Sequence, residues 1–350
     1  MADLSAFELG TLPGLWQWAD QTPRQLAFSA TTRHEAEAWQ AELRDQVIRL
    51  LGGFPAERCD LDPHVIESVE DVSFTRELVV IQTQPGEYMP CYVLRPHEAT
   101  LPFKPVIALH GHGTGGARLL IGNTEDPVEV ELMQTLHYDY ARQLVQRGFL
   151  VFVPVLRGFA ERMEPPPLRN TTDPAWHSSC HEAGMAALLC GKTLLGLRVW
   201  DIMRLVDFIQ TRPESMQPGL GCVGLSGGGT VTLFATALEP RITCAVVSGY
   251  FNTFRESIMA IHHCVCNYIP GILQYAEMVD IAGLIAPRPL LVESGRQDPL
   301  FPSGATQRAF ENLQTIYRRF DADHTLDAVY FDGEHAWHGA KTYGWLDNWL

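Results

Sequence analysis

Five residues, Gly224-Leu225-Ser226-Gly227-Gly228, form a G-x-S-x-G motif between a short apolar run at 221–223 and a helical stretch. Such a sharp turn from strand to helix holds the serine hydroxyl above a sheet, and the small glycines avoid clashes with nearby backbone. The alternative, a phosphate-binding loop, needs a Gly-Lys-Ser/Thr sequence that the motif lacks. We therefore predict that Ser226 is a nucleophile.

Two later residues complete the chemistry that Ser226 needs. A serine hydroxyl is a weak nucleophile near neutral pH, so a histidine must accept its proton and a carboxylate must hold that histidine in the right tautomer. Enzymes with this turn present the residues in the chain order serine, acid, histidine. Asp298 follows an apolar run at 289–293, and His335 follows another at 328–331. We predict that Asp298 orients His335, the general base.

Other acids and histidines fit these roles less well. Glu293 lies inside or at the end of its predicted strand. Asp332 and Glu334 are too close in sequence to His335 to hydrogen-bond easily to its ring nitrogen that points away from the serine. His324 precedes the last predicted strand and faces the wrong end of the sheet, and His338 is expected to cap or pack.

A glycine-rich segment at 109–116 supplies the third requirement, hydrogen-bond donors for the oxyanion of a tetrahedral intermediate. Its glycines allow backbone amides to turn toward the serine. We predict that the backbone amides of His112 and Gly227 form the oxyanion hole.

No metal site is predicted. The alternative role for His110 and His112 is metal binding or loop packing, and a zinc site would need further ligands. His262-His263-Cys264-Val265-Cys266 offers imidazoles and thiols, but without a conventional zinc spacing.

Short apolar runs alternate with helical stretches along most of the chain, which is typical of a mostly parallel sheet flanked by helices. The predicted parallel strands are 106–109, 150–155, 221–225, 244–248, 289–293 and 328–331. The predicted helices between them are 132–146, 194–210, 228–237 and 306–320. Two antiparallel strands, 74–82 and 88–94, lead into the sheet through a turn at 84–87. The fold class is therefore α/β.

The chain divides into an N-terminal part, 1–65, and a catalytic domain, 66–350. Residues 1–30 carry aromatic side chains and are expected to pack as an arm, and 34–51 has the spacing of an amphipathic helix that ends at Gly52-Gly53. Two insertions, 158–192 and 250–280, interrupt the alternation. Insertions of this length beside strand ends usually form lids and substrate walls.

Several residues in or near these insertions are candidates for substrate binding. Arg157 fits two roles, a contact with substrate or hydrogen bonds that link loops to each other. The link is the commoner role of an arginine after a strand. Aromatic rings suit both sugars and acyl chains, although ordinary packing explains them equally well. The other candidates for pocket walls are Trp176, His181, Tyr250, Phe251 and Trp337.

Composition narrows the classes of partner. The 350 residues carry a formal net charge of -15, which disfavours nucleic acid and anionic membranes because a binder of phosphates needs a basic face. No apolar run reaches the length of a membrane span, and the first residues lack a secretory signal pattern. We expect a cytoplasmic protein with reduced cysteines and a small-molecule substrate. Its aromatic arm could dock on a second subunit of a homo-oligomer.

Together these motifs resemble the acetyl xylan esterase and dienelactone hydrolase-like branch of the α/β hydrolases, over about residues 34–350. The likeness rests on His110-Gly111-His112-Gly113, Arg157-Gly158, Leu195-Gly196 to Asp201, the serine motif, Ile285-Ala286-Pro287-Arg288-Pro289 leading to Asp298, and Gly333-Glu334-His335. It implies an α/β-hydrolase fold, a triad of Ser226, Asp298 and His335, and no cofactor. Dienelactone hydrolases have cysteine where this chain has Ser226, so lactone hydrolysis is not implied.

Three functions follow as hypotheses. The first is an esterase acting on a small or carbohydrate-linked ester through an acyl-enzyme. The second is an amidase or peptidase with the same triad. The third is a catalytically silent binding protein with this fold, against which the complete triad argues.

Overall fold

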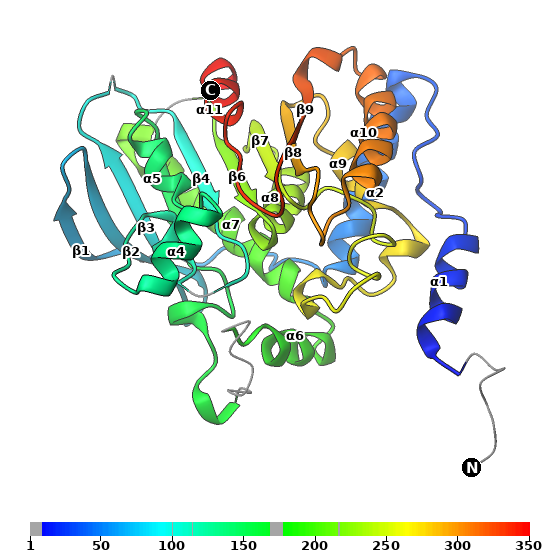
Figure 1. The fold of residues 1–350 in the computed structure, drawn as a ribbon, viewed down its shortest axis with the longest axis horizontal. Coiled ribbons are helices and arrows are strands. Elements are labelled where there is room, and N and C mark those ends of the chain that lie inside the picture. Colours follow the sequence, from blue (N-terminus) through cyan, green and yellow to red (C-terminus); the bar gives the residue numbers. More distant parts are fainter. Residues whose placement is uncertain (1–8, 100, 114, 169–177, 216–217) are drawn as a thin grey trace.

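The computed structural model describes residues 9–99, 101–113, 115–168, 178–215 and 218–350. A sheet of nine strands, in the order β1-β2-β3-β5-β4-β6-β7-β8-β9, crosses the molecule with helices on both sides (Figure 1). Strands β1, β2 and β3 are antiparallel, and from β5 to β9 each neighbouring pair is parallel. The predicted α/β architecture is confirmed.

The strands are β1 (His64–Glu70), β2 (Phe74–Gln84), β3 (Glu87–Pro96), β4 (Pro105–Leu109), β5 (Leu150–Pro154), β6 (Gly221–Leu225), β7 (Cys244–Ser248), β8 (Leu290–Gly295) and β9 (Leu326–Phe331). Sequence analysis missed only β1 among them. All seven of its residues are exposed at the end of the sheet, so β1 has no buried face and no apolar alternation to reveal it.

Alternate residues of the central strands pack on opposite faces of the sheet. Ile107 and Leu109 of β4 belong to one apolar core, with residues of α2 (Arg33–Leu50), α7 (Leu194–Thr211), α8 (Gly227–Leu238), α9 (Met278–Gly283) and α10 (Ser303–Arg318). Val106 and Ala108 belong to the other core, with α3 (Ala117–Leu120), α5 (Tyr140–Val145) and α11 (Thr342–Trp349). Side chains alternate along a strand, so a run of apolar residues serves both cores.

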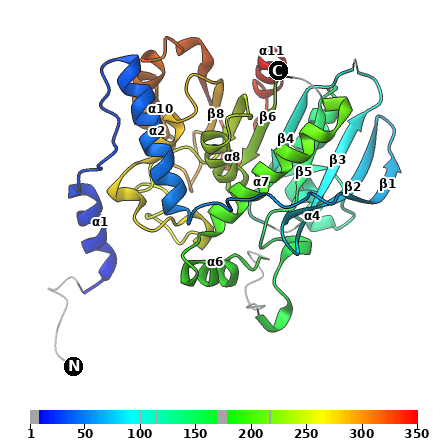
Figure 2. The same ribbon diagram turned by 180° about the vertical axis from the view of Figure 1, so that it is seen from behind.

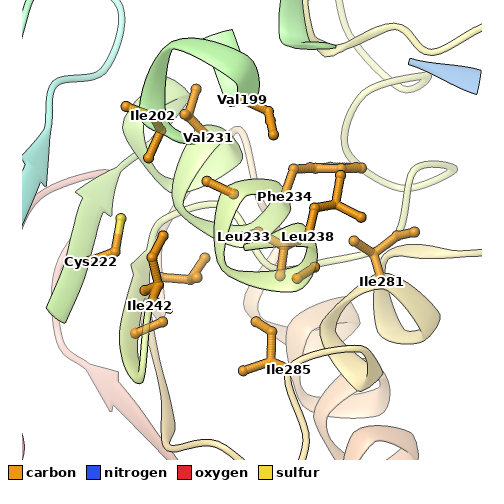
Figure 3. Packing of buried hydrophobic residues seen from close by; sticks show 14 of the residues in the cluster. Val199, Ile202, Cys222, Val231, Leu233, Phe234, Leu238, Ile242, Ile281 and Ile285 are labelled. Atoms are coloured by element: carbon orange, nitrogen blue, oxygen red, sulfur yellow. The ribbon is translucent and has the colours of Figure 1, made fainter. Parts of the chain in front are cut away.

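Helix α8 follows the serine motif and lies at the centre of the larger core. Figure 3 shows Val231, Phe234 and Leu238 of α8 among side chains from β6, α7 and α9. All twelve residues of α8 are buried. The helix that begins directly after Ser226 is therefore enclosed on all sides, which fixes the serine turn.

Helix α2 anchors the N-terminal part of the chain in the core, whereas α1 (Thr11–Gln21) lies on the surface. Thr32 and Glu35 form a capping box at the start of α2, and five of its residues are buried. Gln40 donates 2.8 Å hydrogen bonds to the carbonyls of Gly283 and Ala286. Helix α1 has no buried residue and lies at the periphery (Figure 2), where Trp16 donates a 3.1 Å hydrogen bond to the carbonyl of Met259.

The predicted helix at 132–146 is wrong in one respect, because the chain forms two helices there, α4 (Pro127–Thr135) and α5. His137 has a φ of 51°, a left-handed conformation that interrupts helical hydrogen bonding. The apolar spacing continues across this break, so periodicity alone could not show it.

The insertion at 158–192 contains α6 (Cys180–Leu189), and the insertion at 250–280 contains short 3-10 turns at Val265–Asn267 and Ile272–Gln274. Among the described residues, no single helix has both the length and the apolar composition of a membrane span, although α6 and α7 meet that test together across a 98° bend.

Candidate active site

Ser226 sits in a strained turn between β6 and α8. Its backbone φ is 59° and its ψ is -120°, and its amide donates a 3.0 Å hydrogen bond to the carbonyl of Ser248 on β7. A Cβ on Gly228 would lie 1.9 Å from the Leu109 carbonyl oxygen, and one on Gly224 would lie 2.5 Å from the Gly228 carbonyl. Only glycine fits these two positions, which explains the motif.

Asp298 and His335 form the predicted acid and base pair. The Nδ1–H of His335 donates to Oδ2 of Asp298 at 2.7 Å. Oδ1 of Asp298 accepts hydrogen bonds from the amides of Leu300, at 2.8 Å, and Phe301, at 3.0 Å. The carboxylate side chain is 1% exposed. Both carboxylate oxygens are held, so the carboxylate keeps the Nδ1 proton in place and leaves Nε2 as the basic nitrogen.

The His335 ring lies beside the strand that neighbours the serine turn. A Cβ on Gly249 would be 3.1 Å from Cε1 of His335 and 2.9 Å from a methyl group of Leu225. Gly249 directly follows Ser248, whose carbonyl binds the Ser226 amide. Nε2 of His335 is buried and has no hydrogen-bond partner among the described residues. The fold thus brings the ring of the predicted base to the end of β7, the strand next to the serine turn, and leaves Nε2 unpaired.

Phe301 and His263 form a wall next to His335. The rings of Phe301 and His335 stack at 5.8 Å, and His263 meets Phe301 edge to face at 5.7 Å. Asn267 donates a 3.0 Å hydrogen bond to Nδ1 of His263. Burial, followed by the nearby imidazoles of His112 and His335, lowers the pKa of His263 to about 4, so it is neutral near pH 7. Sequence analysis named His263 only as an unlikely metal ligand, and its distance from the triad in sequence hid this position.

The glycine-rich loop after β4 is held by His110. The amide of Leu156 donates to Nε2 of His110 at 3.1 Å, and Nδ1 of His110 lies 2.9 Å from the carbonyl of Gly111. The Gly111 amide in turn donates to the Tyr138 hydroxyl at 2.5 Å. Burial lowers the pKa of His110 to about 4. Both ring nitrogens of His110 have backbone partners, so its role is loop packing.

His112 and Gly227, the predicted oxyanion pair, are neighbours. A Cβ on Gly227 would lie 3.5 Å from the backbone nitrogen of His112 and 2.7 Å from its Nδ1. The two backbones therefore approach each other beside Ser226. This position suits two amides that share one oxyanion.

The imidazole ring of His112 also lies close to three thiols. The ligand atoms of His112, Cys180, Cys264 and Cys266 all lie within 4.8 Å of one another. The prediction of no metal rested on residues close in sequence, whereas this cluster combines the loop after β4, the first residue of α6, and the 3-10 turn at 265–267 with the residue before it. No spacing rule detects ligands from three separate segments.

The side chain of Arg157 links separate parts of the chain by hydrogen bonds. Its guanidinium makes two 2.8 Å hydrogen bonds to the buried carboxylate of Asp201 and a 2.5 Å hydrogen bond to Glu87. Arg162 also donates to Asp201, at 2.7 Å. These bonds link the loops, which is the commoner of the two roles predicted for Arg157, and its role toward a substrate stays a prediction.

The five other candidates for substrate walls have different positions. Trp337 is 1% exposed and stacks on Tyr140 at 4.2 Å, so it belongs to the core and presents no surface to a substrate. Phe251 is likewise a buried core residue. Tyr250 is also buried and packs on Phe301, behind the wall beside His335. His181 is exposed on α6. Trp176 lies outside the described residues.

Two cavities flank the insertions. One, of about 740 Å³, lies between α1 and residues 254–274, and the other, of about 790 Å³, lies between Arg157 and α6. Neither is lined by Ser226, Asp298 or His335. The insertions therefore contribute walls to both cavities. That they form the walls of the substrate site stays a prediction.

Comparison with known proteins supports this architecture. No family model matches the chain. A Bacillus subtilis (strain 168) protein named "Putative hydrolase YtaP" is 24% identical over 287 residues, which cover 79% of this chain and 88% of that protein. A structure named as a "putative acetyl xylan esterase" from Bacteroides fragilis NCTC 9343 has a TM-score of 0.76 at 16% identity, covering 95% of this chain and 84% of that one.

The structure of Methylesterase BT1017 has a TM-score of 0.69 at 20% identity, covering 97% of this chain and 67% of that one. These likenesses show that the chain has the α/β-hydrolase fold. The predicted fold and the resemblance to acetyl xylan esterase-like α/β hydrolases are confirmed.

Proposed function

We propose that this chain is a serine hydrolase that cleaves a carboxylic ester through an acyl-enzyme. The observation that carries the proposal is the 2.7 Å hydrogen bond between His335 and Asp298, which leaves the buried Nε2 of His335 unpaired at the strand end next to Ser226. A silent binding protein has no need for a buried imidazole with one nitrogen held and the other without a partner.

In the proposed mechanism, Nε2 of His335 accepts the hydroxyl proton as Oγ of Ser226 attacks the ester carbonyl carbon. Asp298 stabilises the imidazolium that forms. The amides of His112 and Gly227 donate to the oxyanion of the tetrahedral intermediate. The C–O bond then breaks, and His335 returns its proton to the departing alcohol.

The second half of the reaction repeats these steps with water. His335 removes a proton from a water molecule that attacks the acyl-serine carbonyl, and the collapse of the second intermediate releases the acid and restores the Ser226 hydroxyl. Every proton passes through the same Nε2, so the unpaired nitrogen is required in both halves.

For the substrate, we propose a short acyl ester, with acetylated carbohydrate as the first class to test. The names of the related structures, an acetyl xylan esterase and a methylesterase, support an ester over an amide. An amide requires firmer protonation of its leaving amine, so the ratio of rates on matched ester and amide substrates measures this preference.

The test is activity and labelling of the purified full chain. We expect hydrolysis of p-nitrophenyl acetate and covalent labelling of Ser226 by a fluorophosphonate, located by peptide mass spectrometry. The matched control is Ser294→Ala, because Ser294 is a buried serine at the end of β8 and outside the proposed machinery. An unlabelled Ser226 together with no turnover of short esters contradicts the proposal.

A further inference from the structure

We propose that His112, Cys180, Cys264 and Cys266 bind one Zn²⁺ ion in a closed, tetrahedral site that fixes the loop carrying the His112 amide. The metal site follows from the cluster itself, and only its effect on catalysis rests on the proposed function. Four protein ligands fill a tetrahedral zinc shell and leave no position for water or substrate, so the role of the ion is structural.

The positions of the four ligand atoms suit zinc. With Zn–S bonds of about 2.3 Å and Zn–N bonds of about 2.0 Å, the edges of a tetrahedral site are about 3.5 to 3.8 Å long. Nε2 of His112 lies 3.1 Å from Sγ of Cys266, and Sγ of Cys266 lies 3.2 Å from Sγ of Cys264. All four atoms lie within 4.8 Å of one another. Small side-chain rotations convert these separations to the required edges.

A buried arginine supplies the counter-charge. Arg198 of α7 is 2% exposed, and its Nη2 donates a 3.0 Å hydrogen bond to Sγ of Cys180. Among the described residues, Arg198 forms no ion pair with a carboxylate, although Asp201, on the same helix, pairs with Arg157 and Arg162. A zinc ion with three thiolates has a net charge of about -1. Arg198 neutralises it, which explains an arginine buried beside sulfur.

Cys180 also has a favourable place in the fold. It is the first residue of α6, where the helix dipole stabilises a thiolate. The thiolate is the form of cysteine that binds zinc. The helix terminus and Arg198 therefore act on the same sulfur from two independent elements.

A disulfide explains the cluster less well. Sulfur atoms in a disulfide are about 2.05 Å apart, and the Cys264 and Cys266 sulfurs are separated by 3.2 Å. A disulfide would also use only two of the three thiols and none of the imidazole. Zinc uses all four groups.

The site shares His112 with the proposed oxyanion hole. Nε2 of His112 faces Cys266, its Nδ1 lies next to Gly227, and its backbone amide is the proposed oxyanion donor. A bound ion would join the loop after β4 to both insertions. We infer that zinc holds this amide in position, as outer groups do in other preorganised sites.

The direct test is the metal content of the full chain, expressed without a polyhistidine tag and purified under reducing conditions. We expect about one zinc per chain by inductively coupled plasma mass spectrometry, retained after dialysis. Replacement by Co²⁺ should give the absorption bands of tetrahedral cobalt and a thiolate-to-cobalt charge-transfer band. The Co²⁺ spectrum is measured on the unmodified chain, so it does not depend on whether a variant folds.

Matched variants locate the ligands. Cys180→Ser, Cys264→Ser and Cys266→Ser should each lose most of the metal and weaken the charge-transfer band. Cys190→Ser is the control, because Cys190 is an exposed thiol directly after α6 and outside the cluster. It should keep the metal content of the unmodified chain.

Two results overturn the zinc site. One is a chain with less than about a tenth of an equivalent of zinc that also gives no charge-transfer band with Co²⁺. The other is a disulfide among Cys180, Cys264 and Cys266 in protein purified under reducing conditions. Ser226→Ala should bind zinc normally, so a missing esterase activity and a missing metal are separate failures.

Discussion

The two sides of the His112–Gly227 pair are built in different ways. On one side, Ser226, Asp298 and His335 each follow a strand of the parallel sheet, β6, β8 and β9. On the other side, the thiols come from two insertions and meet the ring of His112. The first cluster is positioned by the sheet, whose strand ends share one edge. The second is positioned by contacts between loops, which need a further bond to be equally rigid.

The largest expected effect belongs to the triad side. Ser226→Ala should lower kcat for p-nitrophenyl acetate about 10⁶-fold, because it removes the nucleophile. Its thermal stability and zinc content should match those of the unmodified chain. A parallel loss of zinc would show that the two clusters are not independent.

The next effect tests the carboxylate. Asp298→Asn should lower kcat about 10⁴-fold, because an amide in place of Oδ2 favours the wrong tautomer of His335. The control is Glu334→Gln, since Glu334 is an exposed carboxylate beside His335 and one of the rival acids in sequence. Steady-state kinetics of both variants decide the assignment. A loss in Glu334→Gln equal to that in Asp298→Asn would remove Asp298 from the triad.

A smaller effect is expected on the thiol side. Cys264→Ser should lower kcat about 10- to 100-fold with little change in KM, because the oxyanion donors become less ordered while the triad stays intact. Cys190→Ser should have unaltered kinetics. Equal kcat values for Cys264→Ser and Cys190→Ser would show that the metal site has no influence on catalysis.

The last prediction concerns stability and not activity. It involves Glu277, directly before α9 and in the same insertion as Cys264 and Cys266. Its carboxylate accepts hydrogen bonds from the amides of Phe254 and Met278, and burial raises its pKa from 4.5 to about 7. The folded state therefore holds this proton more tightly than the unfolded state. Its contribution to the free energy of unfolding is complete below about pH 4.5 and is lost as the pH rises through about 7.

Glu277→Gln should flatten this pH dependence, measured by urea unfolding between roughly pH 5 and 8. Part of the slope should remain, because burial also raises the pKa of Asp280, while nearby Arg24 lowers both values. The control is Glu311→Gln, an exposed glutamate on α10. Identical slopes in the two variants would argue against a protonated Glu277.

The parallel strands and the serine turn could be predicted because their signals are local. Runs such as 221–225 are short and apolar, and Gly224 and Gly228 are required by contacts within a few residues of the turn or with the adjacent strand. The break at His137 depends on one backbone angle, which apolar spacing does not report.

The thiol cluster and Trp337 were missed or misjudged for another reason. The partners of His112 and the ring that stacks on Trp337 are far away in sequence, and only the tertiary fold brings them together. Loop-to-loop packing of this kind has no periodic pattern.

The outermost strand, β1, has a consequence for how these molecules meet one another. Its exposed residues include Val65 and Ile66, which favour pairing with a second sheet, but also Glu67 and Glu70. On a chain with a net charge of -15, two such edges that approach each other bring carboxylates together. We therefore expect the net negative charge to oppose association through the open end of the sheet, and high salt to weaken that effect.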